Sequence, residues 1–233
     1  MTDLRPYEWL GRLQKVATAE EVRHLLRSQH PAFERGMPPR LAILGAAEEG
    51  RRLVHLCRGH GIEVLAICDD DPAKHGMMVE GLAVKPGSAL DALDRSVPVV
   101  IASHRTVRAS KALRAKGFSN VAPTGLLQAL EPAAFPAQMH YVGIVESLVA
   151  DKLRILAVAD MVADDESRAV LDAAVGYRLT FDPAILDPFV DVPNHYQPPG
   201  MFELGDDEVY VDAGTFDGDS IGWFIERTGG RFS

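Results

Sequence analysis

The chain has 233 residues, enough for one or two domains with a sizeable hydrophobic core. Apolar residues make up 47% and charged residues 24%, which excludes a disordered or fibrous chain. The 24 basic residues against 33 acidic ones give a net charge of -9, so we expect no nucleic-acid partner and no binding to an anionic membrane.

No apolar run approaches the roughly 20 residues that span a bilayer, and the first residues lack an apolar signal core. We therefore expect a cytoplasmic protein. Cys57 and Cys68 have neither a Cys-x-x-Cys spacing nor a partnered histidine, so we expect two buried, reduced thiols. No histidine spacing is typical of a metal site, and none is expected.

Residues 1–37 predict a helical arm. Thr18 and Glu21 form a capping box, in which the Thr18 side chain bonds the Glu21 amide and Glu21 reaches the Thr18 amide. Three apolar residues that follow fall on one helical face: Val22, Leu25 and Leu26.

Residues 38–126 alternate short apolar runs with amphipathic stretches, which is typical of an α/β domain. Right-handed crossovers then predict a small, doubly wound, Rossmann-like parallel sheet. Strands are expected at residues 41–44, 63–67, 82–84, 98–102 and 120–122, and helices at 49–59, 89–93 and 106–116, the last capped by Gly117.

The loop after the first strand is a candidate dinucleotide-type loop, with Gly45 at the tight turn, Ala47 in place of the middle glycine and Gly50 for close packing. Asp69 ends the second strand, where a carboxylate would meet ribose hydroxyls. The acidic residues 48–49 would repel a diphosphate there. The alternative is that these glycines serve packing alone and that Asp69 begins an ordinary turn.

Three segments carry a family pattern: Leu-Ala-Ile-Leu-Gly-Ala at 41–46, Cys-Asp-Asp-Asp-Pro-Ala-Lys-His-Gly at 68–76 and Pro-Val-Val-Ile-Ala-Ser at 98–103. They resemble the nucleotide-sugar-binding domain of PglD-type sugar acyltransferases, which also precedes some methyltransferases. The resemblance implies a crevice for a nucleotide-sugar or for NAD(P) near Gly45, Asp69 and Ser103.

Residues 127–205 predict a helical connector, with helices at 143–162 and 165–177 separated by an acidic break. Asp-Pro pairs at 182–183 and 187–188 predict short helical turns. The Ala- and Leu-rich helices favour core or a dimer surface over a cofactor site. We expect a homodimer, if one forms, to use this connector or the C-terminal strand.

Residues 206–233 predict a strand at 208–211, a glycine loop and the start of a helix. Gly214 lacks the Cβ that would block a ligand, and Asp212 is suited to bond an ammonium group. That combination fits the methionine end of S-adenosylmethionine better than a diphosphate. The alternative is an ordinary strand-to-helix turn.

Three segments at 176–179, 195–202 and 207–220 resemble the start of the FkbM-family methyltransferase domain. The resemblance implies methyl transfer to an oxygen of a sugar or other small molecule. It also implies an incomplete class I methyltransferase fold, truncated after the first strand, loop and helix, and thus a chain without activity. The competing hypotheses are a nucleotide-sugar or dinucleotide binding module and a structural assembly unit. The residues predicted to bind S-adenosylmethionine are Asp212, Ala213, Gly214, Thr215, Asp217 and Gly218.

Overall fold

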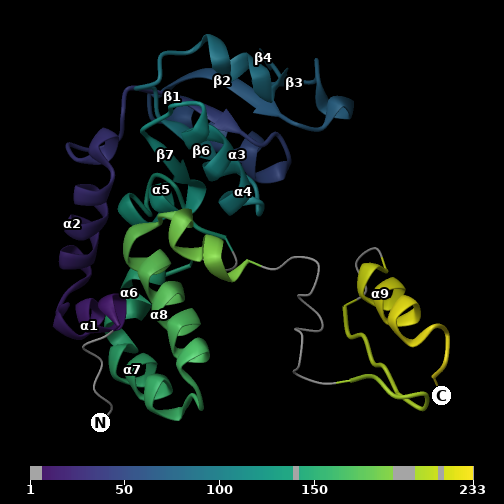
Figure 1. The fold of residues 1–233 in the computed structure, drawn as a ribbon. Helices are drawn as coiled ribbons and strands as arrows, with labels where there is room; N and C mark the ends of the chain where they lie inside the picture. The colour runs from purple at the N-terminus through teal and green to yellow at the C-terminus, as the bar shows by residue number, and fades with distance from the viewer. Residues whose placement is uncertain (1–6, 139–141, 191–202, 215–217, 233) are drawn as a thin grey trace. The chain divides into compact units, whose positions relative to one another are not determined.

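The structure is a computed structural model that describes residues 7–138, 142–190, 203–214 and 218–232 (Figure 1). The chain divides into two units, Met1–Pro188 and Phe189–Ser233. The first unit contains the arm, the α/β domain and most of the connector. The finer boundaries at residues 37, 126 and 205 stay a prediction.

A five-stranded parallel sheet lies at one end of the first unit, beyond the helices of the arm and connector, and it confirms the predicted α/β class (Figure 1). The order is β5-β2-β1-β6-β7, so the chain moves outward on one side of β1 and then crosses to the other side. In doubly wound sheets, ligands bind where the strand order reverses, which is here the carboxyl edge between β1 and β6. The strands are β1 Arg40–Leu44, β2 Glu63–Asp69, β5 Lys85–Pro86, β6 Val99–Ile101 and β7 Val121–Pro123.

Side chains alternate between the two faces of the sheet along each strand, and helices cover both faces, so both faces are buried. Leu41 and Ile43 of β1 face the core shared with α3, α5 and the helical arm. Ala42 and Leu44 face a second core, shared with α4 and a 3-10 helix. The elements that cover the sheet are α3 Glu48–Gly59, the 3-10 helix Gly87–Ala92, α4 Thr106–Ala115 and α5 Thr124–Leu130.

The strand predicted at 82–84 is present at Leu82–Ala83, but it belongs to a small antiparallel hairpin, and β5 takes the place expected for it in the parallel sheet. The hairpin pairs β3 Met78–Val79 with β4 Leu82–Ala83. Glu80 and Gly81 form its two-residue turn with φ of 49° and 80°. Glutamate seldom adopts positive φ, so this turn carries no usual sequence signal.

The helical arm contains α1 Glu8–Lys15, α2 Ala19–Gln29 and a 3-10 turn at Pro31–Phe33. The Glu21 amide donates to Thr18 Oγ1 at 3.2 Å, as predicted. The Glu21 carboxylate, however, accepts from the Ala17 amide at 2.7 Å. That amide precedes the helix and has no helical acceptor, so the long glutamate side chain satisfies it.

The connector contains α6 Ile144–Ala150, α7 Lys152–Met161, α8 Asp165–Thr180 and a 3-10 helix Pro183–Phe189. The single helix expected at 143–162 is therefore two helices. Asp151 separates them with φ of -96° and ψ of 11°, and aspartate favours helix boundaries over helix interiors. The predicted break before α8 is confirmed, since Asp164 caps α8 by accepting from the Ser167 amide at 2.7 Å.

In the second unit, the described residues form α9 Asp219–Thr228 but no strand at 208–211. Val209 and Val211 are 74% and 82% exposed. The expected strand is wrong here because a strand needs a neighbour for its amide and carbonyl groups. Tyr210 instead stacks on Phe224 of α9, with ring centroids 4.6 Å apart.

Candidate functional site

The loop after β1 meets the end of β6 at the switch point of the sheet. Gly45 has φ of 116°, and a Cβ there would come within 2.4 Å of the Ala102 carbonyl oxygen. A Cβ on Gly50 would come within 1.9 Å of the Gly45 carbonyl oxygen. Close packing of β1, β6 and α3 therefore explains both glycines without a ligand.

Asp69 lies at the carboxyl end of β2, as predicted, and its side chain holds the same loop. One oxygen, Oδ2, accepts from the Ala46 amide at 2.7 Å and from Lys74 Nζ at 3.0 Å. The other oxygen accepts from the Asp71 amide at 2.9 Å. Asp69 is buried, so its carboxylate fastens the first glycine loop to the end of β2.

Burial by itself raises the pKa of Asp69. The hydrogen bonds from Ala46, Asp71 and Lys74 together outweigh it, so the pKa lies below the ordinary 3.8. Asp69 is thus an anion at neutral pH, with the Lys74 ammonium beside it. His75 adds a further link through a 2.9 Å contact between its Nε2 and the Asp69 carbonyl oxygen.

The other residues predicted around this loop have different surroundings. Ala47 is exposed at the start of α3 and gives the helix no side-chain cap. Glu49 holds Arg52 through two contacts of 2.8 Å and accepts from Gln128 Nε2 at 2.9 Å. Ser103 follows β6, and its Oγ accepts from the Arg105 amide at 3.2 Å. Gly45 and Gly50 therefore lie against each other, and Asp69 is linked to their loop through the Ala46 amide.

The second predicted site lies in the C-terminal unit. The Asp212 carboxylate accepts from the Gly214 amide at 2.8 Å and from the Ser220 hydroxyl at the start of α9. Gly218 precedes α9 with φ of 86°, a conformation that favours glycine. A Cβ on Gly214 would meet no described atom within 4 Å. Three predicted features lie outside the described residues: Thr215, Asp217 and the segment 195–202.

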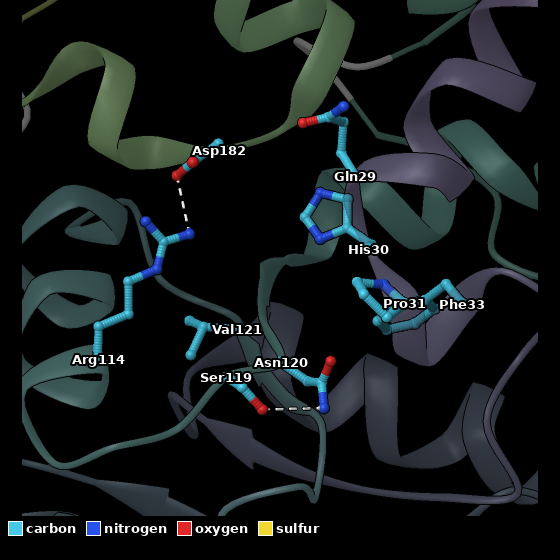
Figure 2. Close-up of a pocket in the computed structure, with 9 residues that line it drawn as sticks. All are labelled: Gln29, His30, Pro31, Phe33, Arg114, Ser119, Asn120, Val121 and Asp182. Atoms are coloured by element: carbon cyan, nitrogen blue, oxygen red, sulfur yellow. Dashed lines mark hydrogen bonds and ion pairs between the residues drawn. The ribbon is translucent and has the colours of Figure 1, made fainter.

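A small polar cavity at the opposite, amino edge of the sheet was not predicted (Figure 2). It has a volume of about 50 Å³, and the arm, α4, β7 and the segment after α8 surround it. His30 lies buried at its wall, with Nε2 2.6 Å from the Thr180 carbonyl oxygen, and burial lowers the pKa of this imidazole. Across the cavity, Arg114 pairs with Asp182 at 2.9 Å. Its residues come from three separated parts of the chain, 29–33, 114–121 and 182, so no local motif indicates it.

Both cysteines are free and buried, as predicted. Burial raises the pKa of Cys57 to about 12 and that of Cys68 to about 11. Within the described ranges, no three His, Cys, Asp or Glu side chains gather as a potential metal site. None of the helices in the described part of the chain has the length and apolar character needed to cross a bilayer.

Neither a protein-family model nor a curated protein matches the sequence. A solved structure does match, the methyltransferase FkbM from Methylobacillus flagellatus, with a TM-score of 0.57 and 22% sequence identity. The alignment covers 96% of this chain and 60% of that one. The chain therefore shares the fold of the aligned part of that structure, and it spans about three fifths of the length of that protein.

Proposed function

We propose that this chain carries the first part of the cofactor site of an S-adenosylmethionine-dependent methyltransferase of the FkbM type, acting on an oxygen of a sugar or another small molecule. The observation that supports this most is the fold similarity to an FkbM methyltransferase, which extends over 96% of the chain. The acid and glycines at 212–218 provide independent support from the sequence.

The glycines of the two candidate loops differ in a way that favours the C-terminal loop. Gly45 and Gly50 are required by contacts within the protein, whereas a Cβ on Gly214 would meet no described atom within 4 Å. Among the described residues, Gly214 thus leaves room beside Asp212 for a ligand. The Asp212 carboxylate accepts from the Gly214 amide and the Ser220 hydroxyl, so it lies at this loop, where it would attract the ammonium group of the cofactor.

The roles follow from this geometry. Asp212 would hold the methionine ammonium group, Ala213 and Gly214 would let the cofactor approach the backbone, and Gly218 would position the start of α9. Thr215 and Asp217 are proposed to complete the loop. When bound, S-adenosylmethionine supplies the methyl group, and the residues of this loop bind and orient it.

We propose that the 233-residue chain binds the cofactor weakly and transfers no methyl group. Residues 208–211 have no sheet neighbour among the described residues, and Val209 and Val211 are exposed. A loop without a sheet behind it is poorly preorganised, and ordering it on binding costs affinity. A dissociation constant in the millimolar range follows for the chain alone.

An NMR titration of the 15N-labelled chain with S-adenosylmethionine tests the proposal, since chemical shifts report weak binding residue by residue. We expect saturable shifts at the amides of residues 212–220. Asp212→Asn should weaken the binding at least severalfold. Asp206→Asn is the matched control, because Asp206 is an acid of the same unit that pairs with Arg231 at 2.7 Å. No shifts in this loop, or equal effects of the two substitutions, would contradict the proposal.

The second candidate function is nucleotide-sugar or dinucleotide binding at the β1 loop, which the switch point between β1 and β6 favours. The Asp69 carboxylate already accepts the Ala46 amide, so a ribose would have to share or replace that contact. Titration of the same labelled chain with UDP-glucose and with NAD decides between the sites. Shifts at residues 45–50 and at Ser103, without shifts from S-adenosylmethionine, would favour the binding module.

A further inference from the structure

Two cavities adjoin at the amino edge of the sheet, on the opposite side from the β1 loop. The small polar cavity beside His30 has a volume of about 50 Å³, and a larger, open cavity has a volume of about 370 Å³. Both are lined by Pro31 and Asn120, so they lie next to each other. Pockets for small ligands have volumes of roughly 300–1,000 Å³, so the pair has room for a small organic molecule.

His30 offers a hydrogen-bond acceptor to the small cavity. The residue is 8% exposed, and its Nε2 lies 2.6 Å from the Thr180 carbonyl oxygen. A carbonyl oxygen only accepts, so Nε2 carries the proton of the ring. Burial lowers the pKa of His30, so at neutral pH the ring is uncharged and Nδ1 has a free lone pair.

The Nδ1 atom of His30 has no hydrogen-bond donor within the described part of the chain. The ring points into the space between Arg114 and Asn120 (Figure 2). Buried polar atoms of folded proteins nearly always have a partner, so this acceptor calls for a donor from a molecule in the cavity.

The other polar groups of the small cavity balance one another in charge. Arg114 pairs with Asp182 at 2.9 Å on the wall opposite His30 (Figure 2). Asn120 donates from Nδ2 to the Ser96 carbonyl oxygen at 2.8 Å, and its own oxygen is a further acceptor. An anion or a cation would meet no uncompensated charge here, whereas a hydroxyl group can both donate and accept. The cavity therefore suits an uncharged ligand that carries hydroxyl groups.

The larger cavity adds an apolar surface to this polar one. Four proline rings line it: Pro31, Pro38, Pro39 and Pro98. Arg40 also lines it, and the charge of this residue acts on the nearby Asp94 carboxylate. Proline rings are rigid and present C–H groups, which suits the C–H face of a sugar ring whose hydroxyl groups stand at its edge.

We propose that the two cavities together bind a neutral sugar, with one hydroxyl donating to His30 Nδ1 and the ring lying against the prolines. Every wall of this site belongs to the first unit, and residues 212–218 belong to the second. The sugar site is therefore additional to the proposed cofactor site. The larger cavity is open and buries only part of a ligand, so we expect a dissociation constant in the millimolar range.

An NMR titration of the 15N-labelled chain with three sugars tests the proposal: D-glucose, D-galactose and N-acetyl-D-glucosamine. We expect at least one of them to give saturable shifts at the amides of residues 29–33, 96–97 and 119–121. Inorganic phosphate should give none there, because the site has no uncompensated positive charge.

A substitution of His30 tests the role of Nδ1. In His30→Gln the amide nitrogen can keep the bond to the Thr180 carbonyl oxygen, but no acceptor remains in the position of Nδ1. We expect sugar binding to weaken about fivefold or more, the usual loss for one hydrogen bond. The matched control is His24→Gln, since His24 is exposed on the same arm and lines neither cavity. Equal effects of the two substitutions would contradict the role of His30.

A second variant blocks the larger cavity without touching His30. Ser96 is exposed at its wall, so Ser96→Trp should abolish the sugar-induced shifts and leave the unfolding free energy in urea unchanged. Absence of saturable shifts with all three sugars would overturn the proposal, because it would mean that the cavities hold solvent alone. Shifts with phosphate but with none of the sugars would also overturn it, as they would show an anion site. Shifts at residues 212–220 with S-adenosylmethionine are read separately, so failure here leaves the proposed function untouched.

Discussion

Glycine serves two different purposes in this chain, and the surroundings of each glycine separate them. At Gly45 and Gly50 a side chain would collide with backbone oxygens, so the fold itself requires glycine. At Gly214 no described atom occupies the space, so the described fold does not require it. The sequence alone cannot make this distinction, because both loops show glycines after an apolar run.

The packing role of Gly50 is testable within a single helix. Gly50→Ala places a Cβ 1.9 Å from the Gly45 carbonyl oxygen, whereas Gly59→Ala, in the same helix, meets nothing within 4 Å. We expect Gly50→Ala to lower the free energy of unfolding by about 2 kcal/mol or more. Gly59→Ala should leave it unchanged or raise it by up to about 1 kcal/mol. Urea unfolding measures both, and equal effects would show that the β1 loop has room for a side chain.

Asp69 makes the stability of the first unit depend on pH. Its pKa is lowered in the folded protein, so the ionised form stabilises the fold. That stabilisation is present above about pH 4 and is lost as the pH falls through the lowered pKa. We expect Asp69→Asn to cost about 1–3 kcal/mol at pH 7, because the amide loses charge-assisted hydrogen bonds.

The difference between wild type and Asp69→Asn should shrink steadily below about pH 4, and urea unfolding at several pH values measures it. Asp70→Asn is the neighbouring control, since Asp70 is exposed. A difference that stays constant down to about pH 2 would mean that the charge of Asp69 plays no part in holding the loop.

The position of Asp69 at the strand end follows from the sequence, but its hydrogen-bond partner does not. The continuous apolar run at 64–68 places the end of β2 to within two residues, and the acid follows that run. Which donor reaches the carboxylate depends on how closely the β1 loop approaches, and this depends on tertiary packing. The Ala46 amide lies there, in the position that the sequence suggested for a ribose.

At the level of elements, the main strands of the sheet and its amphipathic helices were predicted well, whereas a fully buried helix was not. Strand β1 and helices α3 and α4 agree with the prediction within one or two residues. Helix α5 was missed because all seven of its residues are buried, so no polar face marks it as helical. Periodicity reports the contrast between two faces, and α5 has none.

The docking of the arm on the connector was also invisible in the sequence. Asp172 of α8 accepts from the amides of Trp9 and Leu10 at 2.9 and 2.7 Å, so it caps α1 from another helix. The Trp9 ring lies against Gly176, where a Cβ would come within 2.5 Å of it. Residues far apart in the sequence thus form one cap, which no local pattern records.

Two substitutions of Asp172 separate the contribution of its acceptor oxygen from the contribution of its negative charge. Asp172→Ala removes the acceptor for two amides of α1, and we expect a loss of about 1–2 kcal/mol in unfolding free energy. Asp172→Asn keeps an acceptor oxygen. Burial outweighs the hydrogen bonds and raises the pKa of Asp172, so its charge contributes no net stability at neutral pH. The asparagine variant should therefore remain within about 0.5 kcal/mol of wild type at neutral pH, and a loss equal to that of Asp172→Ala would contradict this account.

At the scale of the whole molecule, the two units differ in whether their extended segments find hydrogen-bond partners for their amide and carbonyl groups. In the first unit, β1 has partners on both sides, with Leu44 opposite Cys68 of β2 and Ile101 of β6. In the second unit, the segment predicted as a strand has three consecutive strand-favouring residues, Val209, Tyr210 and Val211, but no such neighbour among the described residues. Residue type predicts which segments favour a sheet, yet only a second strand converts that preference into one.

The second unit is therefore expected to depend on one aromatic cluster. Phe224 is buried between Tyr210, at 4.6 Å, and Phe232, at 5.4 Å between ring centroids. A segment of this size buries little apolar surface, and such units are marginally stable. Phe224→Ala removes the centre of the cluster, so we expect the amides of α9 to lose their protection against hydrogen exchange.

Hydrogen exchange of the full chain, followed by mass spectrometry, measures both units at once. In the wild type, the amides at 209–212 should exchange within about tenfold of the rate of an unstructured peptide, whereas those of β1 should be strongly protected. Phe224→Ala should remove protection in α9 and leave β1 unchanged, and Ile225→Ala, at a half-exposed position of the same helix, should change neither. Strong protection at 209–212 in the wild type would contradict the absence of a ladder partner, because only paired backbone amides exchange slowly. Loss of protection in β1 on substitution of Phe224 would instead mean that the aromatic cluster supports more of the molecule than its own helix.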